Sequence, residues 1–136
     1  MPVTYSIDTT RQLIRTTCIR PLRLAQVLDH FRELKEDPAC VGRLDVLLDA
    51  SDADVVPDSN QLAAVAGAVR SIRDKVQFGS CAVIAGRDAM FGMMRVFEVR
   101  AGDYFGAIRV FRGAAEAEIW LASQKKETDS GSATQS

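Results

Sequence analysis

Along the first third of the chain, the spacing of apolar residues changes from a period of two to the period of a helix. Apolar and polar side chains alternate over residues 3–7, which predicts a half-buried strand. A second strand, rich in β-branched residues, is expected over 12–19, and the short link between the two predicts an antiparallel hairpin. Apolar residues recur at helical spacing over 24–34, and this helix should stop at Asp37, because a residue before proline disfavours the helical region.

Further along the chain, short apolar runs alternate with helical patterns. The expected order is a strand at 44–48, a helix at 62–76, a strand at 81–85, a helix at 88–99, a strand at 105–111 and a helix at 113–122. Strands that alternate with helices pair in parallel through right-handed crossovers. The sequence therefore predicts an α/β domain over 1–122, with a mostly parallel sheet, one antiparallel N-terminal strand and helices packed on the sheet. Residues 123–136 are polar and lack apolar anchors, so they are predicted to be a disordered tail.

The helix expected at 88–99 is more apolar than a helix that covers one face of a sheet needs to be. From residue 90 to residue 99, only Gly92, Arg95 and Glu98 interrupt a run of Met, Phe and Val. These three residues are spaced three apart and form one narrow polar stripe on a helix. The wide apolar arc that remains must meet a lid segment, a second subunit, an apolar ligand or a lipid surface.

The composition of the 136 residues narrows the classes of function. Hydrophobic residues make up 47% and charged residues 26%, and the formal net charge of −1 provides no positive field for nucleic acid. The three cysteines, Cys18, Cys40 and Cys81, form no C-x-x-C pair, which favours reduced thiols in the cytoplasm over disulfides or a zinc site. The sequence shows no signal peptide and no apolar run of the ~20 residues that span a bilayer. A cytoplasmic protein is expected, with peripheral contact at the inner face of the membrane left open.

The apolar arc is the strongest candidate for a binding site. Its larger side chains are Met90, Phe91, Met93, Met94 and Phe97. Methionine adapts well to irregular apolar ligands. The arc is equally consistent with core packing on one side and a homodimer interface on the other. Arg87, Asp88 and Arg95 are candidates for holding an anionic head group beside it, with helix capping by Asp88 and surface ion pairing by Arg95 as the structural alternatives.

No catalytic or metal-binding constellation stands out in the sequence. His30 is the sole histidine and has no cysteine or second histidine at ligand spacing. Asp45 and Asp49 lie four residues apart on a predicted strand, without the arrangement of an acid–base pair. The glycines form neither a phosphate-binding loop nor a dinucleotide fingerprint. The sequence therefore predicts a non-enzymatic domain without a metal or a cofactor.

Several short motifs follow one another between Tyr5 and Leu121. They are Y-x-I-D at 5–8, the strand end Leu48-Asp49, A-V-I-A at 82–85 followed by Asp88 and F-G-M-M-R at 91–95, and V-F-R at 110–112 with E-x-x-x-W-L at 116–121. In this order and spacing, the motifs resemble the SpoIIAA-like (STAS-like) family of small bacterial proteins. The resemblance covers nearly the whole chain. It implies a β-α superhelix with sequentially ordered parallel strands, shared with STAS domains and lipid-carrying CRAL-TRIO domains.

The resemblance implies a binding protein rather than an enzyme. STAS proteins of the anti-sigma-factor-antagonist type act through protein partners and carry a phosphorylatable serine in Asp-Ser-Ser or Asp-Ser-Gly. Here Asp58-Ser59-Asn60 follows Leu48-Asp49, which makes Ser59 the candidate phosphoacceptor, while Asn60 departs from the motif. The structural alternative is a helix cap at Asp58 or Ser59. For the SpoIIAA-like branch, the resemblance points to apolar-ligand binding or membrane association, with the helix at 88–99 as a movable flap.

The leading hypothesis is a non-enzymatic domain that uses the helix at 88–99 to bind an apolar or amphipathic, lipid-like ligand or a membrane surface. The site residues would be Met90, Phe91, Met93, Met94, Arg95 and Phe97. Two alternatives stay open. One is a partner-switching regulator that binds a protein partner and is controlled by phosphorylation of Ser59. The other is a homodimer whose interface covers the same apolar arc. Nucleic acid is not expected as a partner.

Overall fold

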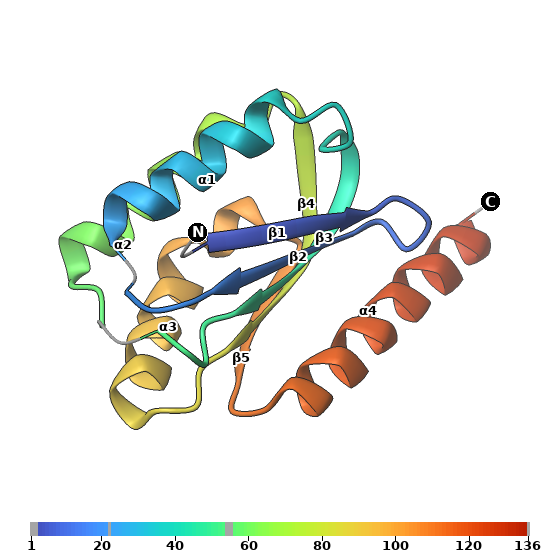
Figure 1. Ribbon diagram of the computed structural model, residues 1–136. Coiled ribbons are helices and arrows are strands. Elements are labelled where there is room, and N and C mark those ends of the chain that lie inside the picture. The colour runs from blue at the N-terminus through green and yellow to red at the C-terminus, as the bar shows by residue number, and fades with distance from the viewer. Residues whose placement is uncertain (1–2, 22, 54–55, 136) are drawn as a thin grey trace.

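A five-stranded mixed sheet forms the centre of the fold (Figure 1). The computed structural model describes residues 3–21, 23–53 and 56–135, with side chains as far as Lys125. The strands are β1 (Val3–Asp8), β2 (Leu13–Cys18), β3 (Gly42–Asp49), β4 (Val76–Ile84) and β5 (Ala107–Phe111). They lie in sequence order across the sheet, with β1 antiparallel to β2 and the remaining neighbours parallel.

Three helices cover one face of this sheet, and a fourth covers the other (Figure 1). The first three, α1 (Leu24–Glu36), α2 (Ser59–Ser71) and α3 (Asp88–Arg100), each connect two consecutive parallel strands, which places them on the same face. A short 3-10 turn, η1 (Gly102–Tyr104), leads into β5, and α4 (Ala114–Gln135) then crosses the opposite face. The predicted α/β class is therefore confirmed, with a mostly parallel sheet and one antiparallel N-terminal strand.

An irregular step between β3 and β4 explains two polar features of the central strands. The Asp45 carboxylate of β3 is buried and accepts a hydrogen bond from the backbone N–H of Ser80 at 2.8 Å. Gly79 lies against the side chains of Asp45 and Arg43, so that a Cβ atom at this position would collide with them. The register between the two strands shifts at this step. Asp45 therefore satisfies a buried backbone group, which accounts for a carboxylate inside the sheet.

Apolar contacts hold α4 on the second face of the sheet. Ala117 and Leu121 of this helix are buried against the sheet. The strand residues in this cluster are Leu13, Leu47, Ala82, Ile84 and Phe111. The Trp120 ring also tilts against Phe111, with 5.6 Å between the ring centroids. Toward the edge of the helix, Glu118 pairs with Arg15 of β2 at 2.8 Å.

Side-chain caps define where α1 and α2 begin. At α2, Asp58 Oδ1 accepts a hydrogen bond from the backbone N–H of Gln61 at 2.8 Å, and Gln61 Oε1 accepts one from the backbone N–H of Asp58 at 2.9 Å. This reciprocal exchange is a capping box. The helix cap expected at Asp58 or Ser59 is thus confirmed at Asp58, and Ser59 is the first helical residue. At α1, Gln26 Oε1 accepts in the same way from the backbone N–H of Arg23 at 2.9 Å.

Several predicted boundaries between elements are wrong. The helix predicted at 62–76 ends at Ser71, and β4 begins at Val76 instead of at residue 81. Ile72 and Val76 fit the helical pattern, but Ile72 is buried at the turn after α2 and Val76 is buried as the first residue of a strand. The last strand begins at Ala107 rather than at residue 105, because residues 105 and 106 form a bend between η1 and the strand.

The final helix is longer than the sequence predicts. The backbone of α4 is helical as far as Gln135, whereas the sequence predicts a helix that ends at 122 and a disordered tail at 123–136. Gln124 and Lys125 have unbranched side chains with favourable helix propensity, and no proline interrupts this segment. Lys125 Nζ also donates a hydrogen bond to the backbone carbonyl of Arg11 at 2.5 Å. Residue 136 lies outside the described residues.

Candidate functional site

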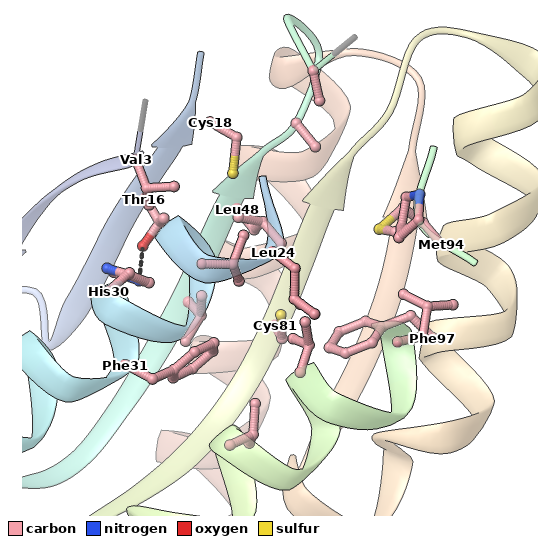
Figure 2. A pocket seen from close by; sticks show the side chains of 18 of the residues that line it. Val3, Thr16, Cys18, Leu24, His30, Phe31, Leu48, Cys81, Met94 and Phe97 are labelled. Carbon is pink, nitrogen blue, oxygen red and sulfur yellow. Dashed lines mark hydrogen bonds between the residues drawn. The ribbon is translucent and has the colours of Figure 1, made fainter. Parts of the chain in front are cut away.

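A cavity of about 340 Å³ lies between the sheet and the three helices of the first face (Figure 2). Side chains from β1 to β4 line it on the sheet side, and side chains from α1, α2 and α3 line it on the helix side. Most of them are apolar, including Ile14, Val46 and Cys81 from the sheet and Leu62 and Val65 from α2. A concave apolar space of this volume falls within the range of small-molecule binding sites.

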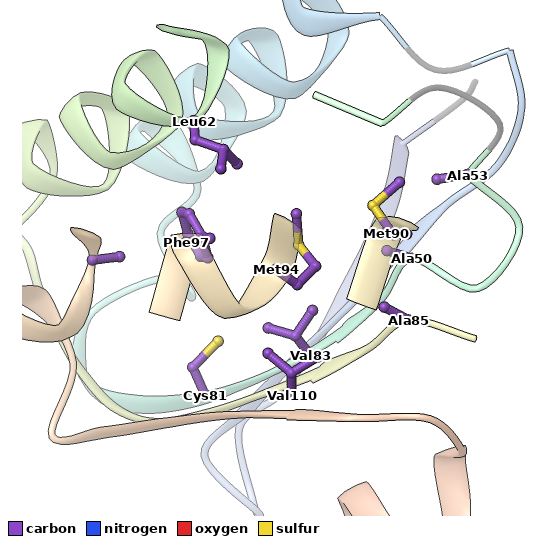
Figure 3. Packing of buried hydrophobic residues seen from close by; sticks show 11 residues of the cluster. Ala50, Ala53, Leu62, Cys81, Val83, Ala85, Met90, Met94, Phe97 and Val110 are labelled. Carbon is purple, nitrogen blue, oxygen red and sulfur yellow. The ribbon is translucent and has the colours of Figure 1, made fainter. Parts of the chain in front are cut away.

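The inward face of α3 supplies one wall of the cavity. Met90, Met94 and Phe97 line it, and all three are buried. Their spacing of four and three residues places them on the same side of the helix. Figure 3 shows them in one cluster with Val83 and Val110 of the sheet. The structure thus brings together half of the predicted site, on the face of α3 that points toward the sheet.

The other three residues of the predicted site do not line the cavity. Phe91 is half-buried, and the guanidinium carbon of Arg112 lies 4.3 Å from the centroid of its ring. Met93 is half-buried and packs against the cluster shown in Figure 3. Arg95 is exposed and pairs with Glu98 at 3.5 Å, as the structural alternative for this residue expects.

Arg112, which directly follows β5, anchors the start of α3. Asp88 is the first residue of α3, and Arg87 rather than Asp88 holds the N-cap position, so the predicted cap is wrong. The Asp88 carboxylate instead accepts a hydrogen bond from Arg112 Nη1 at 2.5 Å, and the same nitrogen donates to the Gly86 carbonyl at 3.2 Å. Asp88 is therefore engaged with a neighbouring strand end, while Arg87 and Arg95 are exposed.

The apolar stripe of α1 borders the cavity on the opposite side from α3. Leu24, Val27 and Phe31 line the cavity, and each of them is only half-buried. His30 and Leu34 are the buried residues of this helix. A molecule inside the cavity would cover the half-buried stripe, and removing that apolar surface from water is favourable.

One polar pair interrupts the apolar lining. His30 of α1 and Thr16 of β2 are 7% and 3% exposed, and His30 Nε2 lies 3.3 Å from Thr16 Oγ1 (Figure 2). The Nδ1 atom of His30 has no hydrogen-bond partner among the described residues. Burial lowers the pKa of His30 from 6.5 to about 4, so the imidazole is uncharged at pH 7. The rings of Tyr5 and Phe31 flank it, with centroid distances of 5.2 and 5.4 Å.

Two thiols also line the cavity. Burial raises the pKa of Cys18 to about 11 and the pKa of Cys81 to about 12. Both thiols therefore stay protonated at neutral pH and act as small apolar groups rather than as nucleophiles. In the described part of the chain, no group of three or more His, Cys, Asp or Glu side chains is placed to hold a metal ion. The lining is thus suited to binding through apolar contacts.

The cavity reaches the surface near the carboxyl ends of the parallel strands. Exposed Arg23, just before α1, lines it there, together with half-buried Pro57 and Gln61 around the start of α2. This is the edge of the sheet near which α1 and α2 begin. Ile19 and Val56 adjoin lining residues in the sequence and are large apolar side chains that stay exposed.

Ser59, the candidate phosphoacceptor, lies outside the lining of the cavity. It is exposed at the first position of α2, and Arg100 Nη2 at the end of α3 donates a hydrogen bond to its hydroxyl oxygen at 2.6 Å. The two residues are 41 positions apart in the chain, so no local sequence pattern reveals this contact.

The cavity and the His30–Thr16 pair were not predicted from the sequence. In the sequence, His30 is a lone histidine without a second metal ligand or a catalytic partner at suitable spacing. One signal for its position was present: His30 precedes Phe31 and lies four residues before Leu34, so it falls beside the apolar stripe of its helix. Its partner Thr16 is 14 residues away on a strand, where no helical spacing points to it.

Comparisons with protein-family models, with curated proteins and with solved structures give no match. The resemblance to the SpoIIAA-like family therefore stays a prediction that depends on the sequence motifs. Among the residues with described placement, no helix has both the length and the apolar character needed to cross a membrane.

Proposed function

We propose that this protein binds a small apolar or amphipathic molecule in the cavity between α1, α2, α3 and the sheet. The observation that supports the proposal is the cavity itself, about 340 Å³ of mostly apolar space inside the domain. The cavity opens to the surface, so its apolar lining stays in contact with water unless a bound molecule covers it, and covering it is favourable. Because the lining is mostly apolar, the occupant should be mostly apolar as well.

The volume limits the size of the ligand. An apolar cavity of roughly 150 Å³ accommodates one benzene molecule. By proportion, the cavity of about 340 Å³ holds on the order of a dozen non-hydrogen atoms. A straight chain of about ten carbons with one polar end group meets this limit.

This proposal places the ligand against the inner face of α3 rather than on its outer arc. Met90, Met94 and Phe97 would contact the ligand. Val96 and Val99 on the outer side of α3 are 40% and 81% exposed. Membrane contact and homodimer formation, the alternatives for the same helix, would use that outer side.

A cavity-filling substitution with a matched control tests the proposal. Val27→Trp adds a large side chain inside the cavity, and Val99→Trp adds the same side chain on the outside of α3. Isothermal titration calorimetry measures the binding of 1-decanol to both variants and to the wild-type protein, after circular dichroism has shown that they fold. We expect Val27→Trp to weaken binding by about tenfold or more and Val99→Trp to leave it unchanged, because only the first occupies the space of the ligand.

Other outcomes separate the alternatives. Equal affinity of both variants for 1-decanol would contradict the proposal. So would a wild-type protein that neither binds 1-decanol nor carries a small molecule in native mass spectrometry. A dimer that Val99→Asp dissociates, or vesicle binding that Val99→Asp abolishes, would assign the outer side of α3 to those functions. If Val27→Trp fails to fold, Val65→Phe on α2 fills the same cavity with a smaller change.

A second candidate function is regulation through phosphorylation of Ser59, which the contact with Arg100 favours. A phosphoryl group on Ser59 would lie at the start of α2 beside the Arg100 guanidinium, and both would stabilise its negative charge. Mass spectrometry of the peptide that contains Ser59, from protein purified from its native host, is expected to show a phosphorylated fraction. Ser59 that is unmodified in every growth condition, with the same protein partner bound by Ser59→Ala and Ser59→Asp, would contradict this function.

A further inference from the structure

His30 lines the cavity, and one of its two ring nitrogens has no hydrogen-bond partner among the described residues. The residue is 7% exposed, and its Nδ1 atom is buried without a partner among the described residues. Its other ring nitrogen, Nε2, lies 3.3 Å from Thr16 Oγ1. A buried polar atom without a partner is unfavourable, and nearly all such atoms in folded proteins are satisfied. His30 lines the cavity, so a molecule bound there can supply this partner once a small side-chain adjustment brings Nδ1 to the cavity surface.

The pairing of Nε2 with Thr16 leaves Nδ1 able either to donate or to accept a hydrogen bond. An uncharged imidazole has one nitrogen that donates and one that accepts. When the Thr16 hydroxyl donates to Nε2, the proton of the ring lies on Nδ1, which then donates. When Nε2 donates to Thr16, Nδ1 accepts. A hydroxyl group on the ligand satisfies Nδ1 in both arrangements, because a hydroxyl both donates and accepts.

The cavity offers no buried countercharge to an ionised ligand. Of the described residues that line it, Arg23 alone carries a charge at pH 7, and Arg23 is exposed. Burial holds the pKa of His30 at about 4 and keeps the ring uncharged. Transfer of a carboxylate or an ammonium group into such surroundings without a partner is strongly unfavourable. The part of the ligand that meets His30 should therefore be polar and uncharged.

We infer that the cavity binds an uncharged amphiphile, of the chemistry of a straight-chain alcohol of about ten carbons, whose hydroxyl group forms a hydrogen bond with His30 Nδ1. This inference rests on the proposed function and adds the head group, the charge and the orientation of the ligand. In Figure 2, His30 and Thr16 lie at one end of the pocket, and Met94 and Phe97 lie at the other. The alkyl chain would therefore extend from α1 toward α3.

The test compares ligands that share one alkyl chain and differ in their head groups. Calorimetry at pH 7 measures the binding of 1-decanol, decanoate and decylammonium to the full-length protein. We expect 1-decanol to bind about tenfold more tightly than either ion. His30→Phe removes the polar atom but keeps a planar ring, and it should weaken 1-decanol binding about tenfold. His30→Asn places its amide group near the position of Nδ1 and should retain most of the affinity.

Because the chain contains a single histidine, the wild-type protein gives a direct readout that needs no variant to fold. With ¹⁵N-labelled histidine, long-range proton–nitrogen spectra show the two ring nitrogens of His30 alone. Formation of a hydrogen bond at Nδ1 changes its chemical shift. We expect the Nδ1 signal to move as 1-decanol saturates the cavity, with a smaller change at Nε2.

The outcomes distinguish failure of the inference from failure of the proposed function. Suppose that 1-decanol and decanoate bind equally well, that Val27→Trp abolishes both, and that the Nδ1 signal does not move. The inference is then wrong, and the proposed function stands. Tighter binding of decanoate that Arg23→Ala reverses places the head group at the mouth of the cavity and also overturns the inference. If none of the three ligands binds and native mass spectrometry shows no small molecule, the proposed function itself is wrong.

Discussion

At the scale of single residues, the uncharged state of His30 links the cavity to the pH dependence of folding. Burial lowers the pKa of His30 to about 4 in the folded protein, compared with 6.5 as its ordinary value. Between these two pH values, the unfolded chain binds a proton that the folded protein does not bind. Because the unfolded state binds more protons there, the free energy of unfolding falls as the pH is lowered from 7 toward 4.

We expect His30 alone to lower the free energy of unfolding by about 2 kcal/mol between pH 7 and pH 5. Urea unfolding at the two pH values measures the loss, and His30→Asn is the comparison because its amide does not titrate. The variant should lose about 2 kcal/mol less than the wild-type protein over this interval. Contributions from the carboxylates are the same in both proteins and cancel. Equal losses of unfolding free energy in the two proteins would mean that the pKa of His30 is the same in the folded and unfolded states.

Gly79 is a second residue whose surroundings determine what can replace it. A Cβ atom at this position would collide with the side chains of Asp45 and Arg43. Gly79→Ala should therefore lower the free energy of unfolding by about 1–3 kcal/mol, because the carboxylate that holds the backbone N–H of Ser80 must move. Gly67→Ala is the control, since its Cβ atom meets nothing within 4 Å and alanine suits a helix better by about 1 kcal/mol. Chemical denaturation of both variants decides, and a Gly79→Ala protein as stable as Gly67→Ala would refute the account.

At the scale of elements, the hydrophobic pattern indicates the α-helices and strands of the described residues in order, but it misses the short η1 turn and does not show where each element ends. Ile72 and Val76 continue the apolar spacing of α2, yet the chain leaves the helix at Ser71. When the turn after a helix is also buried, the apolar spacing continues through the turn and does not show where the helix ends. The cavity is missed for a related reason. The spacing of Leu24, Val27 and Phe31 shows which side of α1 faces the sheet. No local sequence pattern, however, determines how far the helix lies from the sheet.

The excess of apolar residues on α3 is visible in the sequence. The sequence does not show which of them face the cavity and which lie outside it. Met90, Met94 and Phe97 face the cavity, and Phe91 lies beneath Arg112. That division depends on an arginine from the end of β5, and a contact between residues so far apart in the chain follows from the folded topology. Five of the six predicted site residues are apolar, and the period of a helix fixes their inward or outward directions only relative to one another.

The resemblance to the SpoIIAA-like family implies that α3 is a movable flap, and Arg112 is the contact that such a movement must break. Its guanidinium contacts Asp88, the Gly86 carbonyl and the ring of Phe91 at the start of α3. We expect Arg112→Ala to increase amide hydrogen exchange in the first turns of α3, with β4 unchanged, because the contacts are local and partly exposed.

Arg109→Ala provides the matched control for this experiment. Arg109 also lies over an aromatic ring, that of Phe111 at 5.2 Å, but it makes this contact within β5. Hydrogen exchange followed by mass spectrometry should show no change in α3 for this variant. If Arg112→Ala leaves the exchange of α3 at the wild-type rate, the buried face of α3 alone holds the helix in place. Breaking the Arg112 contacts would then not be the step that allows the flap movement implied by the resemblance.

At the scale of the whole molecule, the two faces of the sheet are built differently. On one face, α4 packs against the strands through Ala117, Leu121 and Trp120. On the other face, the sequential strand order and right-handed crossovers set α1, α2 and α3 together in one layer, with the cavity beneath them. The cavity touches all three helices and four strands. A bound molecule therefore contacts elements from most of the chain and should stabilise the domain as one unit.

We expect 1-decanol to raise the unfolding temperature of the whole domain. A ligand at a hundred times its dissociation constant adds about 2.7 kcal/mol to the free energy of unfolding when it binds only the folded state. For a domain of this size, that corresponds to an increase on the order of 10 °C. Differential scanning calorimetry measures the shift. The binding heat capacity should be negative at the same time, because apolar surface leaves water.

The response of two tryptophan variants then shows whether the stabilisation comes from the cavity. Val99→Trp leaves the space open and should respond to 1-decanol as the wild-type protein does. Val27→Trp fills part of the space with its own side chain, so its unfolding temperature should rise by no more than about half as much at the same ligand concentration. An equal shift in both variants would mean that the ligand stabilises the fold from the surface. A clearly larger shift in Val99→Trp would mean that a molecule from solution completes the packing between the three helices and the sheet.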